Sequence, residues 1–149
     1  MMAVNLTAVF LGCKFALPHM LKQASGVIVN VASLAGLNFV DAYARGTMAT
    51  TAAGTGVVLA EPAAGPVHVV IPPSAVALHA SRPEGSPRNV WRATVTELRP
   101  AFDRVRITLD GPLPLVAEIT PNAVDRLGLR SGSSVWAAVK ATEVTAHAA

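Results

Sequence analysis

Few residues of this sequence stand at the spacings that metal or nucleotide chemistry requires. The four histidines are far apart along the chain, no Cys-x-x-Cys pair accompanies them, and they are His19, His68, His79 and His147. Structural zinc sites use much shorter ligand intervals. No P-loop is present, and the single Gly-x-Gly, at residues 54–56, has Leu59 where a third glycine is needed. The sequence therefore predicts no metal centre, no ATP hydrolysis and no dinucleotide site.

Composition and charge place the chain among folded proteins. Of its 149 residues, 52% are hydrophobic and 14% are charged, which is too apolar for a disordered chain. The longest apolar stretch, residues 1–21, is interrupted by polar residues, so no membrane insertion is expected. The 12 Lys and Arg residues are dispersed, and no nucleic-acid binding is predicted. With a single cysteine, Cys13, and no secretory pattern at the start, we expect a cytoplasmic protein.

The distribution of charge divides the chain into two halves. Residues 1–81 contain few charged side chains, whereas residues 82–149 contain most of them. Between the two patterns, residues 46–65 are rich in Gly, Ala and Thr and lack a sustained helical or strand period. This composition predicts a linker that contains one short strand, Val57 to Leu59. No internal repeat is apparent.

The first half predicts a helix followed by a short strand. Apolar residues recur at helical spacing within residues 4–21, with Pro18 as a point of disturbance. The β-branched run of residues 27–31 is typical of a strand buried on both faces. Together they form half of an α/β unit, which has no sheet of its own to join.

The second half predicts strands with one exposed face. Apolar and polar residues alternate within residues 91–96, 104–109, 113–120 and 135–140, and Asp110-Gly111 favours a hairpin. Residues 67–71 and 75–78 predict additional edge strands around Pro72-Pro73. Thr120-Pro121 is typical of a helix start, and Gly128 of its end. We therefore expect a mainly β fold, a small β-barrel with one short helix, preceded by the helix–strand α/β fragment.

Several separated motifs of the second half occur in the order found in one known family. The segments are Glu84 to Asn89, Ile119 to Leu129 and Val135 to Val144. They resemble the TOBE or Mop-type molybdate-binding domain, as found at the C-terminus of ATP-binding subunits of molybdate-import ABC transporters. The resemblance extends over residues 67–146 and suggests a domain at 66–146. It implies an OB-like barrel that forms a homodimer and binds molybdate or tungstate near subunit contacts.

The same resemblance implies a binding site for a tetrahedral oxyanion. The family's Ser-Ala-Arg-Asn motif corresponds to Ser86, Pro87, Arg88 and Asn89, and its Lys-Ala step corresponds to Lys140 and Ala141. Such an anion offers only acceptors, so its site should gather donors and cations. Thr120, at a helix start, is expected to add a hydroxyl. Pro87 replaces alanine and removes one backbone donor. The alternative is that Ser86-Pro87 is an ordinary turn and Lys140 a solvated strand lysine.

The first half resembles a different family, the short-chain dehydrogenases/reductases. The resemblance lies in residues 5–12, 18–20 and 26–36 and suggests an incomplete fragment at residues 1–45. Asn5, Ser33 and Tyr43 match three members of that family's catalytic set, but Thr47 stands where its lysine belongs. Without an ammonium group nearby, a tyrosine is a poor proton donor at neutral pH. No competent catalytic site is predicted here.

Three functions follow from these patterns. The first is an oxyanion-binding or regulatory domain related to molybdate ABC transport ATPase subunits. A transport role would then require a separate ABC transporter ATPase subunit, because this chain has no Walker A sequence. The second is a structural dimerisation domain without a ligand. The third is a remnant NAD(P)-dependent oxidoreductase, and since its Tyr-x-x-x-Lys pair and dinucleotide fingerprint are missing, no enzymatic activity is expected.

Overall fold

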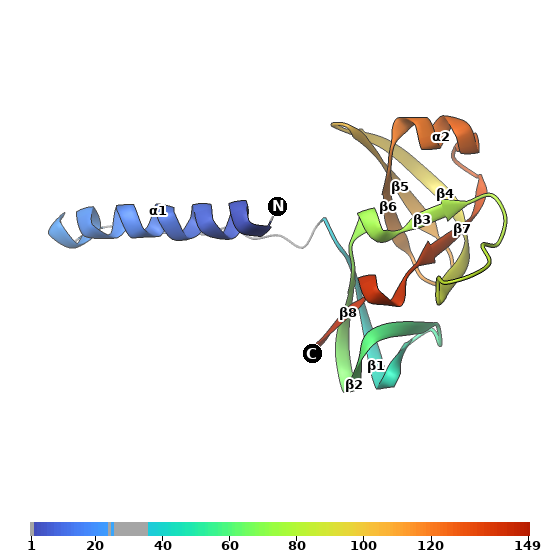
Figure 1. Ribbon diagram of the computed structural model, residues 1–149, viewed down its shortest axis with the longest axis horizontal. Helices are drawn as coiled ribbons and strands as arrows, with labels where there is room; N and C mark the ends of the chain where they lie inside the picture. The colour runs from blue at the N-terminus through green and yellow to red at the C-terminus, as the bar shows by residue number, and fades with distance from the viewer. Residues whose placement is uncertain (1, 24, 26–35) are drawn as a thin grey trace. The chain divides into compact units, whose positions relative to one another are not determined.

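The chain divides into two compact units, Met1–Ser33 and Leu34–Ala149. The computed structural model describes residues 2–23, 25 and 36–149 (Figure 1). In the first unit, helix α1 (Met2–Gln23) corresponds to the predicted helix and continues through Pro18. The strand predicted at residues 27–31 and the candidate Ser33 lie outside the described residues. Among the helices that are described, none has both the length and the apolar character needed to cross a membrane.

The second unit consists of two antiparallel sheets. A three-stranded sheet has the order β1 (Asn38–Thr51), β2 (Gly56–Ile71) and β8 (Thr145–Ala148). A five-stranded sheet has the order β3 (Ala77–His79), β7 (Ser134–Val139), β4 (Asn89–Ala101), β5 (Arg104–Asp110) and β6 (Leu115–Ile119). The remaining elements are helix α2 (Pro121–Leu127) and the 3-10 turns η1 (Pro73–Ala75) and η2 (Ala141–Glu143).

In the second half, strands form where the alternation of apolar and polar residues predicts them. In β4, Trp91, Ala93 and Val95 are buried, while the residues between them are exposed. Burial of such apolar faces is the main stabilising term for both sheets. The turn between β5 and β6 requires Gly111, because a Cβ there would lie 2.9 Å from the Arg92 carbonyl oxygen.

The mainly β prediction is confirmed, but a closed barrel is not observed. In the described part of the chain, β3 and β6 are the edges of the five-stranded sheet and approach each other without pairing. Strand β2 pairs with β1 on one side and with β8 on the other, so these three strands form a sheet of their own instead of extending the larger one. The hydrophobic core therefore lies between two sheets, whereas the sequence predicts a single barrel around it.

Residues 46–65, for which the sequence predicts a linker, form the far end of the β1–β2 hairpin. The turn between the strands is fixed by a hydrogen bond from Gly54 N–H to the Thr51 carbonyl, at 2.9 Å. Ala49 and Val57 are fully buried in this hairpin. The strand period is hidden because small residues form part of the core and because a bulge between Gly46 and Met48 shifts the register. Strand β1 begins at Asn38, so residues 38–45 are part of this sheet.

The second unit contains an internal repeat that the sequence did not reveal. We define the first repeat as residues 38–79 and the second as residues 89–148. Each begins with an asparagine that faces the end of a later strand, since Asn38 pairs with Ile71 and Asn89 pairs with Val139. In each, that later strand leads directly into a 3-10 turn and a final short strand, η1 and β3 or η2 and β8. The second repeat also contains strands β5 and β6 and helix α2, between its first strand and the strand that precedes the 3-10 turn.

The two repeats exchange contacts reciprocally. Strand β3 of the first repeat pairs with β7 of the second, and β8 of the second pairs with β2 of the first. The registers correspond, with Ala77 opposite Ala138 in one case and Thr145 opposite Val70 in the other. Reciprocal contacts of this kind are those that an approximate two-fold relation produces. The repeats therefore form a dimer-like arrangement within one chain.

Candidate functional site

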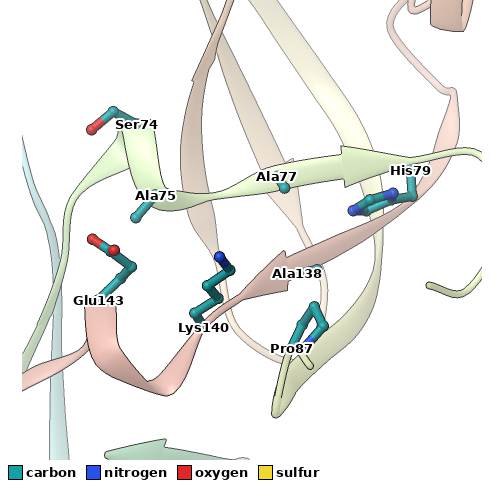
Figure 2. Close-up of a pocket in the computed structure, with 8 residues that line it drawn as sticks. All are labelled: Ser74, Ala75, Ala77, His79, Pro87, Ala138, Lys140 and Glu143. Atoms are coloured by element: carbon teal, nitrogen blue, oxygen red, sulfur yellow. The ribbon is translucent and has the colours of Figure 1, made fainter. Parts of the chain in front are cut away.

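An open pocket of about 430 Å³ lies between the two repeats (Figure 2). Its lining residues are Ser74, Ala75, Ala77, His79, Pro87, Ala138, Lys140 and Glu143. Ser74 and Ala75 come from η1, and Ala77 and His79 come from β3, all in the first repeat. The others come from the second repeat and from the loop that precedes β4. In Figure 2, the Lys140 side chain lies between Glu143 and Pro87 and points toward the segment carrying Ala75 and Ala77.

The structure brings Pro87, the centre of the predicted motif, to the same pocket as Lys140. The reason is the pairing of β4 with β7, in which Asn89 stands opposite Val139. The residues before Asn89 and the residue after Val139 therefore emerge side by side. Ser86 and Arg88 flank Pro87 in the chain and are both exposed.

Asn89 is buried at the start of β4. Its side chain is 2% exposed and is hydrogen-bonded to the backbone of β2. The Val58 N–H donates to Asn89 Oδ1 at 2.7 Å, and Asn89 Nδ2 donates to the Val58 carbonyl at 2.9 Å. The amide therefore fastens the start of β4 to the first repeat. It thereby positions the loop of residues 86–88, and Asn89 is not among the residues that line the pocket.

Thr120 and Ala141 make hydrogen bonds that stabilise the local backbone. The Thr120 hydroxyl accepts a hydrogen bond from Ala123 N–H at 3.3 Å, which caps helix α2, and Thr120 does not line the pocket. Ala141 begins η2, where its carbonyl accepts a hydrogen bond from Val144 N–H at 3.1 Å. These two residues shape the elements next to the site.

Lys140 is the cationic group of the pocket. It is exposed and precedes η2 in an extended conformation. Among residues 36–149, none of the ion pairs includes Lys140, so its ammonium is available to a ligand. Ser74 and His79 also line the pocket, and Glu143 contributes one carboxylate to the same lining. Such a set suits an anion with several oxygen acceptors.

Ser74, His79 and Glu143 were not identified from the sequence. A signal was nevertheless present, because Val76 and Val144 are both buried and each is followed three residues later by a histidine. Alignment of residues 71–79 with residues 139–147 would have shown η1 and η2 to be equivalent. Within the described residues, no group of three His, Cys, Asp or Glu side chains could hold a metal ion.

The dehydrogenase-like candidates do not come together in one described unit. Tyr43 lies on β1 of the second unit and is 52% exposed. The guanidinium carbon of Arg45 lies 5.7 Å from the centre of its ring. Asn5 belongs to α1, in the other unit, and Ser33 lies outside the described residues. The order of these residues in the sequence therefore does not correspond to a described site.

Two protein families match this chain over different segments. The model of the TOBE domain matches residues 85–146, and that of the short chain dehydrogenase matches residues 1–56. Both resemblances stated from the sequence are thus confirmed. The dehydrogenase match extends into β1, although the structure pairs that strand with β2.

Curated relatives are named for both of these kinds of protein. The molybdenum import ATP-binding protein ModC of Mycobacterium tuberculosis is 42% identical over 84 residues, 54% of this chain and 23% of ModC. ModC of Bordetella parapertussis is 39% identical over 92 residues, 58% of this chain and 25% of ModC. The 2-(R)-hydroxypropyl-CoM dehydrogenase of Xanthobacter autotrophicus is 64% identical over 36 residues, 24% of this chain and 14% of the enzyme. The chain therefore spans about a quarter or less of the length of these relatives.

A solved structure shares the fold. The cytoplasmic molybdate-binding protein ModG, in a crystal form with molybdate bound, aligns with a TM-score of 0.63 and 21% sequence identity. The alignment covers 81% of this chain and 100% of the ModG chain. It therefore supports an OB-like fold for the second unit.

Proposed function

We propose that the second unit binds a tetrahedral oxyanion, molybdate or tungstate, in the pocket between the two repeats. The observation that carries this proposal is that Lys140 and Pro87 line one pocket together with Ser74 and His79. The proposal is supported by the match of residues 85–146 to the TOBE domain and by relatives named molybdenum import ATP-binding proteins.

The chemistry of the pocket suits this ligand class. A dianion with four oxygens gains most from cations and from N–H or O–H donors that it does not have to displace from other partners. Lys140 provides the charge, and Ser74 and His79 provide donors from the opposite repeat. Arg88, exposed on the adjacent loop, supplies a second cation. Because the pocket is open, the anion retains part of its hydration, and the desolvation cost is modest.

The internal repeat bears on whether a second copy of the chain is needed to build the pocket. Both walls of the pocket come from one chain, so the site does not require a homodimer to form. We propose that the chain associates with a separate ATPase subunit if it acts in transport, because it corresponds to only about a quarter of ModC. A homodimer can form in addition, and oxyanion binding does not depend on it.

Substitution of Lys140 tests the proposal. Titration calorimetry of the full chain with molybdate and tungstate should show binding, and Lys140→Ala should weaken it by about 10–100-fold. This loss corresponds to one charged hydrogen bond of about 1.5–3 kcal/mol. Lys22→Ala, on helix α1, is the matched control and should leave the affinity unchanged. If the folded wild-type chain gives no heat with molybdate, tungstate or sulfate, oxyanion binding is excluded.

A further inference from the structure

Strand β1 has a long edge along which no strand of the described residues pairs. Strand β2 lies on its other side. The edge belongs to a strand of 14 residues, whereas the other edge strands, β3, β6 and β8, have three to five residues each. Such an edge presents a row of backbone N–H and C=O groups that can pair with another chain. It is therefore a candidate surface for strand pairing.

The outward face of β1 carries two large side chains and two charges in alternation. Its successive exposed residues are Phe39, Asp41, Tyr43 and Arg45. Phe39 is 44% exposed and Tyr43 is 52% exposed. The regular part of the strand ends at Gly46, which has a φ of +65° and precedes the bulge. The segment before this bulge is the part of β1 that can pair regularly.

The two charges of this face remain accessible to a further partner. Asp41 contacts His68 Nδ1 through Oδ1 at 2.7 Å, yet the Asp41 side chain is 84% exposed. Arg45 is exposed, and none of the ion pairs found in residues 36–149 includes it.

The spacing of these charges complements itself about Tyr43. Asp41 and Arg45 stand two residues before and two residues after Tyr43. When two β1 strands pair antiparallel about a two-fold axis at Tyr43, each Asp41 lies opposite Arg45 of the other copy. Any other axis leaves these charges unpaired or, at Asp41 or Arg45 itself, places like charges opposite each other.

We propose that two copies of this chain associate through the free edges of β1, antiparallel and centred on Tyr43. The two three-stranded sheets then form one continuous sheet, in which the ion pair occurs twice and the exposed aromatic side chains gain cover. No residue of β1 lines the pocket beside Lys140. The interface therefore goes beyond the proposed function and does not depend on it.

Charge reversal in the full chain tests this interface by sedimentation equilibrium. The wild-type chain should be a dimer, and Asp41→Arg or Arg45→Asp should each raise the dimer Kd by about tenfold or more, because each replaces two attractive pairs by two repulsive ones. The double variant should restore the Kd. Asp103→Arg, at the exposed turn between β4 and β5, is the matched control and should leave it unchanged. Circular dichroism and Tm establish that each variant is folded.

Cross-linking tests the register. In a Cys13→Ser background, Tyr43→Cys should form a disulfide-linked dimer on oxidation, since directly opposed residues of an antiparallel pair have Cα atoms about 4.5–5.5 Å apart. Thr47→Cys, which lies opposite Phe39 in this register, should not.

Three results would overturn the proposal. They are a wild-type chain that is monomeric at every concentration, a dimer that persists unchanged in both folded single variants, and cross-linking through Thr47→Cys but not through Tyr43→Cys. Titration with molybdate separates this inference from the proposed function. A β1-linked dimer that gives no heat with molybdate or tungstate would remove the proposed function and leave the interface standing.

Discussion

The two repeats of the second unit have the same backbone plan and different chemistry. Both fasten a buried asparagine to the opposite repeat, and both end in a 3-10 turn followed by a strand that joins the other sheet. At the residue before that turn, one repeat carries Pro72 and the other Lys140. The comparison shows that the positions that maintain this fold are few and buried, and that the neighbouring exposed positions are free to differ.

The largest effect is expected for the two asparagines. Asn38 is 6% exposed, receives a hydrogen bond from Val116 N–H at 2.6 Å, and donates to the Val116 and Ile71 carbonyls. Asn38→Ala and Asn89→Ala each leave buried backbone groups without partners, which should lower the free energy of unfolding by about 2–4 kcal/mol. Urea denaturation measures this loss.

The same pair of variants also tests whether the repeats differ in function. In the fraction that remains folded, Asn89→Ala should weaken molybdate binding because the loop of residues 86–88 loses its support. Asn38→Ala should not, because the equivalent loop of the first repeat carries Leu37. Equal loss of affinity in both variants would contradict the assignment of the site to one repeat.

A smaller effect is expected at Glu143. Its counterpart in the first repeat is Ala75, and both line the pocket next to Lys140. Glu143→Gln removes a carboxylate that opposes the anion and should raise the affinity for molybdate by about 3–10-fold. Calorimetry at low ionic strength measures the change, and added salt should reduce it. A decrease in affinity would show that the carboxylate orders Lys140 instead of opposing the ligand.

The smallest effect concerns helix α2, which only the second repeat possesses. Thr120→Ala removes the helix cap and should cost about 1 kcal/mol of stability, measured by the shift in Tm. The affinity for molybdate should stay the same, because Thr120 does not line the pocket. A loss of affinity without a change in Tm would restore the role that the sequence suggested for this hydroxyl.

The strands of the second repeat were predictable from sequence because their buried faces use large apolar residues at strict alternation. Ile107 and Leu109 of β5 are buried, with Thr108 between them exposed. In the first repeat, strand β1 contributes the small residues Ala44 and Ala49 to the buried core. Alanine carries little periodic signal, and the bulge after Gly46 interrupts what remains. From its sequence alone, a hairpin of this composition is therefore difficult to distinguish from a linker.

The candidate site was predictable only on the side that carries a sequence motif. The resemblance identified the segment around Pro87 and Lys140, which the structure brings to one pocket. It could not reveal that the Asn89 side chain is hydrogen-bonded to the backbone of Val58. That contact joins the two repeats, and their arrangement depends on strand pairing between residues far apart in the sequence. Ser74 and His79 were missed because the correspondence between residues 71–79 and residues 139–147 was not recognised in the sequence.

The exchange of the final strands between the two repeats determines how the second unit unfolds. Strand β3 completes a sheet made otherwise by the second repeat, and β8 completes one made by the first. Neither half can satisfy its backbone alone, so the unit should melt in a single cooperative transition. The connecting segment of residues 80–88 is largely exposed, and a protease that cuts there should leave two fragments that stay together until denaturant separates them.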